Sequence, residues 1–182
     1  WLRDNLNIIN ESKEVESLAM SVKDNGDVYF VPAFSGLFSP HWDETARGVL
    51  VGLSRFSNKS HIARAVLESV AYQSCELLDS MEKDTGIYFE SVNVDGGMVE
   101  NNLLMQFQSD IFNKKVNSQQ INEITALGVA AASYIYLNNL PLDTMGEFIT
   151  NSQTWSPNMD SKQRDHYLSK WDKAISKSKQ WT

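Results

Sequence analysis

Cysteine is nearly absent from the sequence, and histidine is scarce. Cys75 is the only cysteine in 182 residues, so the chain can form no internal disulfide, which fits a reducing compartment. Cys75 lies inside a helical apolar pattern, which favours a buried small side chain. The three histidines, His41, His61 and His166, stand far apart, without cysteine or carboxylate neighbours at metal-ligand spacing. We therefore expect no metal site in this chain.

Long apolar runs and an excess of basic residues are also missing. No run of about 18 apolar residues occurs, so we expect no membrane span. The net charge of −7 and the pI near 4.9 argue against nucleic acid as a partner, because binding a phosphate backbone requires a basic face. No signal peptide opens the chain, and we expect a cytoplasmic protein. The sequence starts at Trp1 without a methionine, in what reads as an amphipathic helix, so we expect a fragment of a longer protein.

Two widespread catalytic motifs are absent too: the Gly-x-Ser-x-Gly elbow of hydrolases and the Gly-x4-Gly-Lys-Ser/Thr phosphate loop. What the sequence does contain is 42% apolar residues and five tryptophans, which indicate a folded core. A chain of 182 residues is long enough for one well-filled domain.

Apolar residues recur at helical and strand spacings in alternation, which predicts an α/β fold. The long helix is the best defined, because Ile62, Val66 and Val70 share one stripe and Gly86 follows where a C-terminal glycine belongs. The expected helices are residues 2–9, 15–22, 58–83, 102–112, a segment that Thr125 caps, and 160–180; the expected strands are residues 28–31, 48–51, 92–94 and 115–116.

Two further segments carry structural expectations. The helix after Thr125 is rich in small residues (126, 128 and 130–132), which predicts close packing on a sheet. The loop of residues 33–45 combines glycine and proline with several bulky aromatic side chains. These either fill an edge of the core or shape an opening, and we expect them to fill the core, as loop aromatic residues usually do. Asp43 in this loop could orient a group across a cleft, although nothing in the sequence shows it.

The most informative segment is residues 92–105. A β-branched run ends in Asp95, Gly96 and Gly97, and a helical pattern starts at once. Glycines allow positive φ and the close approach of a ligand, and a helix start presents unpaired N–H groups and partial positive charge. A nucleotide site is one interpretation. A plain strand–helix connection is the other, and from this segment alone it is the commoner case.

Several segments, in one order and spacing, resemble the FGGY carbohydrate kinases, and most closely those members that phosphorylate glycerol. These segments are residues 31–37, 39–43, 46–53, 61–68, 95–98, 101–106 and 123–128. Three positions depart from the pattern: His41 replaces a tyrosine, Ile124 replaces a threonine, and residues 119–122 lack a proline. None of the three touches the Gly-Gly-x-x-x-Asn element.

The resemblance implies an actin-like, ribonuclease-H-like α/β domain in which helices flank a mixed sheet. Residues 1–182 correspond to the C-terminal, nucleotide-binding lid of such a kinase. ATP and Mg²⁺ bind with glycerol in a cleft between this domain and the N-terminal half, which supplies the catalytic base and the glycerol contacts. No catalytic residue is therefore expected here, the chain alone should be inactive, and the intact enzyme is expected to be a homo-oligomer.

The resemblance also assigns the site residues. Gly97 matches a glycine whose backbone lies against the nucleotide, and Asn101 matches an asparagine that reaches the adenine. Gly96 and Met98 flank them as expected contacts. Two alternatives stay open: the same domain of another sugar or polyol kinase, and a non-catalytic binding protein that retains the fold.

Overall fold

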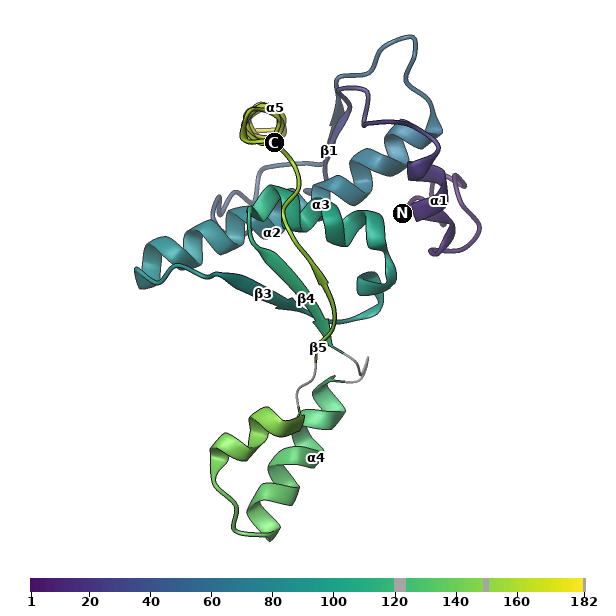
Figure 1. Cartoon of the computed structure of the whole chain (residues 1–182). Coiled ribbons are helices and arrows are strands. Elements are labelled where there is room, and N and C mark those ends of the chain that lie inside the picture. Colours follow the sequence, from purple (N-terminus) through teal and green to yellow (C-terminus); the bar gives the residue numbers. More distant parts are fainter. Residues whose placement is uncertain (120–123, 149–150, 182) are drawn as a thin grey trace.

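The computed structural model describes residues 1–119, 124–148 and 151–181, and it confirms the predicted alternation of helices and strands (Figure 1). The elements are α1 (Glu14–Met20), β1 (Tyr29–Val31), β2 (Val49–Val51), α2 (Lys59–Thr85), β3 (Ser91–Val94), η1 (Gly97–Glu100), α3 (Asn102–Phe112), β4 (Lys115–Gln119), α4 (Ile124–Leu137), η2 (Leu142–Phe148), β5 (Asn151–Trp155) and α5 (Ser161–Ser178).

The longest helix, α2, is defined at both ends by local signals. The Asn58 side chain accepts hydrogen bonds from the backbone of Ser60 and His61, which satisfies N–H groups that no helical carbonyl reaches. Gly86 ends the helix with a φ of 68°, a conformation that suits glycine. Between these ends Cys75 is buried, and burial raises the pKa of its thiol to about 12. The predicted helix and the burial of Cys75 are both confirmed.

The strands form two separate sheets. β3 and β4 are parallel, with Val92 opposite Val116, and β5 pairs antiparallel with the other edge of β4. This mixed sheet leaves β3 at one edge. β1 and β2 form an antiparallel pair of their own, with Phe30 opposite Leu50.

The main core lies where α2, α3 and α5 meet these sheets. Trp171 of α5 is 1% exposed and stacks on Tyr72 of α2 at a ring-centroid distance of 4.9 Å. Phe107 of α3 meets the edge of the Tyr72 ring at 5.5 Å. In Figure 1, α5 is viewed end-on above α3, and the chain reaches it from β5. Helix α5 therefore covers the side of Tyr72 that α2 and α3 leave free.

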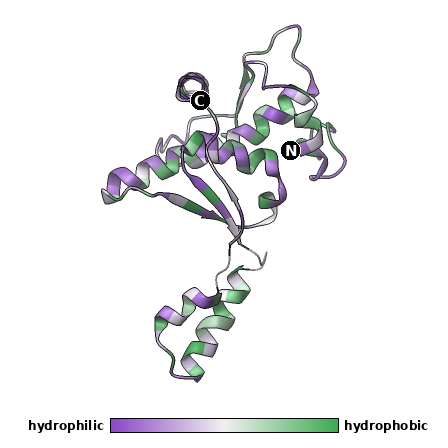
Figure 2. Ribbon diagram, in the orientation of Figure 1, coloured by the Kyte–Doolittle hydropathy of each residue, from purple (hydrophilic) through white to green (hydrophobic). Residues whose placement is uncertain are grey.

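Helix α4 and the turn η2 form an outlying lobe, away from both sheets (Figure 1). Ala131 and Ile135 are buried, and the ring of Tyr134 contacts that of Phe148 at 5.9 Å. Tyr136 and Leu137, however, are 82% and 76% exposed, and Figure 2 shows the apolar residues of this lobe. The expected packing of α4 on a sheet is wrong for the described chain, because η2 is the element that covers it.

Other expectations also fail. Residues 2–9 form turns instead of a helix: Asn7 takes a φ of 50°, and Leu2 and Ile9 are buried in a small cluster with Ala63. Strand β5 was not expected. Thr125 lies inside α4, one residue after its start, so it is not the cap. The expectations for residues 120–123 lie outside the described residues.

Candidate functional site

The glycine turn connects β3 to α3 through a short 3₁₀ turn. Gly96 has a φ of 93° and a ψ of 173°, a region that is essentially restricted to glycine. Its N–H donates a 2.7 Å hydrogen bond to the side chain of Asp95. Gly97 then opens η1 with a φ outside the positive range. The turn therefore needs a glycine at position 96 for its conformation, whereas position 97 has no such need.

Open space lies over both glycines. A Cβ atom built on Gly96 or Gly97 would meet no atom within 4 Å. A depression of about 280 Å³ borders the turn, and its lining includes Met98, Val70 and Gln108. Met98 is 48% exposed and also borders a second depression of about 450 Å³, which runs toward Trp1. The structure thus brings Gly96, Gly97 and Met98 to one surface that a ligand can reach.

Asn101 has a structural task at this site. Its side-chain oxygen accepts a 2.8 Å hydrogen bond from the backbone N–H of Leu104, so it caps α3. Among the described residues, no group bonds to its Nδ2. The sequence suggested both a donor and an acceptor for a ligand, and the cap already uses one lone pair of the acceptor oxygen. The amide N–H₂ group remains as the donor.

Gln108 was missed by the sequence analysis. It follows Leu104 by one helical turn on α3, it is 6% exposed, and it borders the 280 Å³ depression. Its carbonyl oxygen has no hydrogen-bond partner in the part of the chain that the structure describes. A buried polar atom without a partner costs free energy, which makes it available to a ligand or water. The spacing 101-104-108 on one helix face was the signal for it.

The aromatic loop does not fill the core. Phe34, Phe38 and Trp42 are 57%, 71% and 75% exposed, so this expectation is wrong. Leu37 is buried instead, and Phe34 and Phe38 line a depression of about 470 Å³. The buried apolar positions of this loop are Ala33, Leu37 and Ala46.

Asp43 holds this loop in shape. Its side-chain oxygen accepts hydrogen bonds from the hydroxyl and the backbone N–H of Thr45, at 2.6 Å and 2.9 Å, and from the N–H of Ala46. The Thr45 hydroxyl is the main cause that lowers the pKa of Asp43. His41, the residue in the tyrosine position, contacts Glu76 at 2.8 Å and Lys179 at 3.1 Å. Asp43 and His41 therefore stabilise the conformation and the position of this loop.

The described residues meet the requirements of neither a metal site nor a membrane-spanning helix. Over the residues that the structure describes, no three histidine, cysteine or acidic side chains gather as a metal site would require. Within the same part of the chain, no helix combines the length and the apolar character needed to cross a bilayer.

Known proteins share both the sequence and the fold. Residues 1–135 match the C-terminal domain of the FGGY family of carbohydrate kinases. Glycerol kinase from Azorhizobium caulinodans is 49% identical over 182 residues, and that from Chloroflexus aurantiacus is 50% identical over 184 residues. The whole chain aligns with 36% of the length of each of these relatives. It therefore spans about a third of the relatives it matches.

Solved structures agree. A crystal structure of Plasmodium falciparum glycerol kinase with ADP superposes with a TM-score of 0.89 at 33% identity, over 98% of this chain and 36% of that one. A gluconate kinase from Lactobacillus acidophilus gives a TM-score of 0.80 at 23% identity over 97% of this chain and 36% of its own, which shows a common fold. The predicted actin-like α/β fold is confirmed. The chain belongs to the FGGY family of carbohydrate kinases.

Proposed function

We propose that residues 1–182 are the nucleotide-binding lid of a kinase that transfers the γ-phosphate of ATP to glycerol, giving sn-glycerol 3-phosphate and ADP. The observation that carries this proposal is the open surface over Gly96 and Gly97, in the turn that leads to Asn101 at the start of α3. The glycerol kinase activity of the relatives supports glycerol as the substrate, and the ADP in the Plasmodium falciparum crystal structure supports the nucleotide.

Each residue of the turn has a part in this proposal. The backbone of Gly97 lies against the nucleotide, because no side chain intervenes there. Asn101 donates a hydrogen bond from Nδ2 to the adenine, while its oxygen remains bonded to Leu104. Gly96 shapes the turn, and Met98 offers an apolar surface at its rim.

The contribution of this domain to phosphoryl transfer is positioning. Such transfer needs little covalent chemistry from the protein and depends on alignment and charge stabilisation. A nucleotide held at the Asp95–Asn101 turn has its phosphates placed for the glycerol hydroxyl, and closure of the domain excludes competing water. Mg²⁺ supplies charge neutralisation on the phosphates when bound. We expect the nucleotide and the other half of the kinase to supply the ligands of Mg²⁺. The described part of this chain has no group of three or more histidine, cysteine or acidic side chains that could hold a metal ion.

The rest of the kinase completes the site. Since the chain spans 36% of its relatives, we assign the catalytic base and the glycerol contacts to the N-terminal half. We further propose that the intact enzyme is a cytoplasmic homo-oligomer.

A substrate panel on the full-length kinase tests the proposal. With MgATP, glycerol should give sn-glycerol 3-phosphate at a kcat/KM well above those for xylulose and gluconate, the substrates named for two structural neighbours. A preference for either sugar would move the protein to another branch of the family. Failure to bind ATP would favour a non-catalytic role. The purified chain alone should produce no glycerol 3-phosphate above blank.

A further inference from the structure

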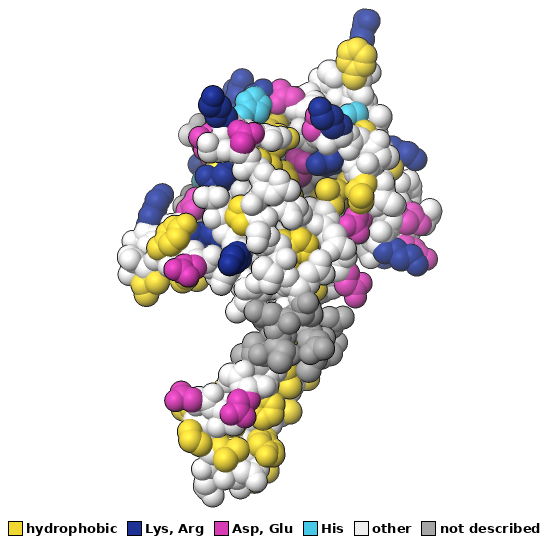
Figure 3. All heavy atoms as spheres, in the orientation of Figure 1, with side chains coloured by type: hydrophobic (Ala, Val, Ile, Leu, Met, Phe, Trp, Pro, Cys, Tyr) yellow, Lys and Arg dark blue, Asp and Glu magenta, His cyan; other side chains and the backbone are white. Residues whose placement is uncertain are grey.

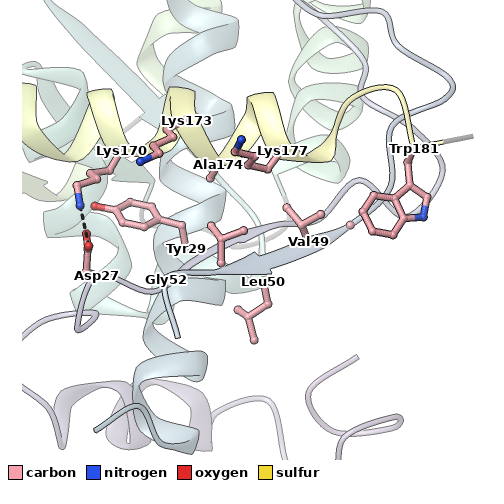
Figure 4. A pocket seen from close by; sticks show the side chains of 12 residues that line it. Asp27, Tyr29, Val49, Leu50, Gly52, Lys170, Lys173, Ala174, Lys177 and Trp181 are labelled. Carbon is pink, nitrogen blue, oxygen red and sulfur yellow. Dashed lines mark hydrogen bonds and ion pairs between the residues drawn. The ribbon is translucent and has the colours of Figure 1, made fainter. Parts of the chain in front are cut away.

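A second groove lies between the β1–β2 pair and helix α5, and it shares no lining residue with the depressions at the glycine turn. Its volume is about 730 Å³, within the range of small-molecule sites. Val49, Val51 and Ala174 contribute apolar walls, and Trp181 closes one end (Figure 4). The groove can therefore accept an apolar body of appreciable size.

Three lysines line the α5 side of this groove, although the chain as a whole carries a net charge of −7. Lys170 is paired with Asp27, at 2.6 Å between Nζ and the carboxylate oxygen. Lys173 and Lys177 follow along the same helix, and no described side chain pairs with either ammonium. They lie one helical turn apart, roughly 6 Å along the axis. Lys170 is thus neutralised within the chain, whereas Lys173 and Lys177 keep their positive charge for an anion from outside.

Tyr29 adds a buried polar group to the same groove. The residue is 3% exposed, and its hydroxyl makes no hydrogen bond of 3.5 Å or less to the described residues, although the side chains of Asn25 and Tyr72 lie near enough to oppose the rise of its pKa. Figure 4 shows the ring across the groove, with the hydroxyl directed toward Lys170 and Asp27. Burial raises the pKa of Tyr29 above its usual value, so the hydroxyl keeps its proton and can donate. Leaving such a group unsatisfied is costly, and a ligand oxygen would relieve that cost.

We propose that this groove binds a small amphipathic anion, with a phosphate-type group on Lys173 and Lys177 and an apolar or aromatic body toward Trp181. Charge complementarity selects the anionic group, and the apolar walls select the body. The alternative is that these lysines only keep another chain from pairing with the short edge strand beside them. In that case the groove should have no affinity for the anion.

The test uses the full-length kinase labelled with 5-fluorotryptophan, with ADP and glycerol present to fill the catalytic cleft. The Trp181 resonance is assigned from the Trp181→Phe variant. Phenyl phosphate should shift this resonance at lower concentrations than either phenol, which lacks the charge, or inorganic phosphate, which lacks the body. Equal affinity for phenol and phenyl phosphate, or no shift of the Trp181 signal, overturns the proposal.

Matched variants locate the binding. The double variant Lys173→Gln/Lys177→Gln should weaken phenyl phosphate binding by roughly tenfold or more, since charge-assisted contacts are lost. Lys162→Gln is the control, because Lys162 is exposed on α5 but does not line the groove. Tyr29→Phe should weaken binding without affecting the response to phenol. If the double variant binds as tightly as the wild type, the lysine row is not the site.

Discussion

The backbone N–H of Leu104 donates a 2.8 Å hydrogen bond to the side-chain oxygen of Asn101. This bond fixes one end of the Asn101 amide at the start of α3 and leaves the other end, Nδ2, without a described partner. The helix cap and the proposed adenine contact therefore use different atoms of one side chain. Substitutions can separate the two roles.

Asn101→Ser in the full-length kinase should keep the cap and lose the adenine contact, because serine caps helices about as well as asparagine. We expect a Tm close to wild type and a roughly five- to thirty-fold higher KM for ATP, from about 1–2 kcal/mol of lost hydrogen bonding. The KM for glycerol should change little. Asn101→Ala is the matched comparison: it should raise the ATP KM similarly and also cost about 1 kcal/mol of stability. A wild-type ATP KM in the serine variant would remove Asn101 from the site.

Gly97→Val should abolish nucleotide binding with little effect on folding. Its added side chain enters open space in the free domain, and its φ is not positive, so the fold tolerates it. A bound nucleotide would collide with the same atoms. Gly96→Ala should behave differently, costing roughly 1–3 kcal/mol of stability, because its φ of 93° is strained for any other residue. Calorimetric ATP titration measures the loss of binding in each variant, and thermal melts measure the loss of stability. If Gly97→Val lowers the Tm as much as Gly96→Ala does, the turn has only a structural role.

Glu68 should make stability fall as the pH rises toward neutrality. The residue is 3% exposed, and its burial raises its pKa to about 7, against the opposing effect of Arg64 at 2.9 Å. Between its ordinary pKa of 4.5 and this value, the folded state holds a proton that the unfolded state has released. The free energy of unfolding therefore decreases over that window, by about 3 kcal/mol in total.

Urea unfolding of the wild type and of Glu68→Gln, at pH 5 and pH 8, measures this contribution. The variant cannot titrate at this position, so its pH dependence should be flatter by that amount. Identical slopes for the two proteins would mean that Arg64 keeps the carboxylate ionised throughout.

The isolated chain should melt cooperatively and self-associate through the α4 lobe. Apolar side chains gather on this lobe in Figure 3, and exposed apolar patches promote association. Tyr136→Ser with Leu137→Ser should shift the sedimentation profile toward monomer. Phe56→Ser is the control, because Phe56 is 88% exposed but lies in the loop after β2. Unchanged association in the double variant would place the contact elsewhere.

Local signals made part of this fold predictable. The ends of α2 follow from Asn58 and Gly86, which act on the backbone beside them and need no distant partner. The strand–glycine–helix segment was recognised for the same reason, since the conformation of Gly96 is a property of the turn itself. Gly97 and Asn101 were assigned as site residues by the resemblance to the FGGY kinases, and that assignment stays a prediction.

Tertiary effects account for the rest. Leu2 and Ile9 have helical spacing, but their burial beside Ala63 is achieved by turns. Strand β5 pairs with the free edge of β4, although only its last two residues, Thr154 and Trp155, are of types that favour a strand. The spacing of Gln108 put it on the same helix face as Asn101 and Leu104, but only the packed structure shows that its carbonyl oxygen is buried without a partner among the described residues.

The position of Trp171 sets the order in which the protein can mature on the ribosome. Tyr72 is made about a hundred residues earlier, yet its ring is covered by Trp171, which is joined in the core by Ala174 and Ile175. Until this last segment leaves the exit tunnel, the nascent chain exposes the aromatic surface of α2. Translation must therefore reach α5 before this core can close, and until then the ring of Tyr72 lacks its cover.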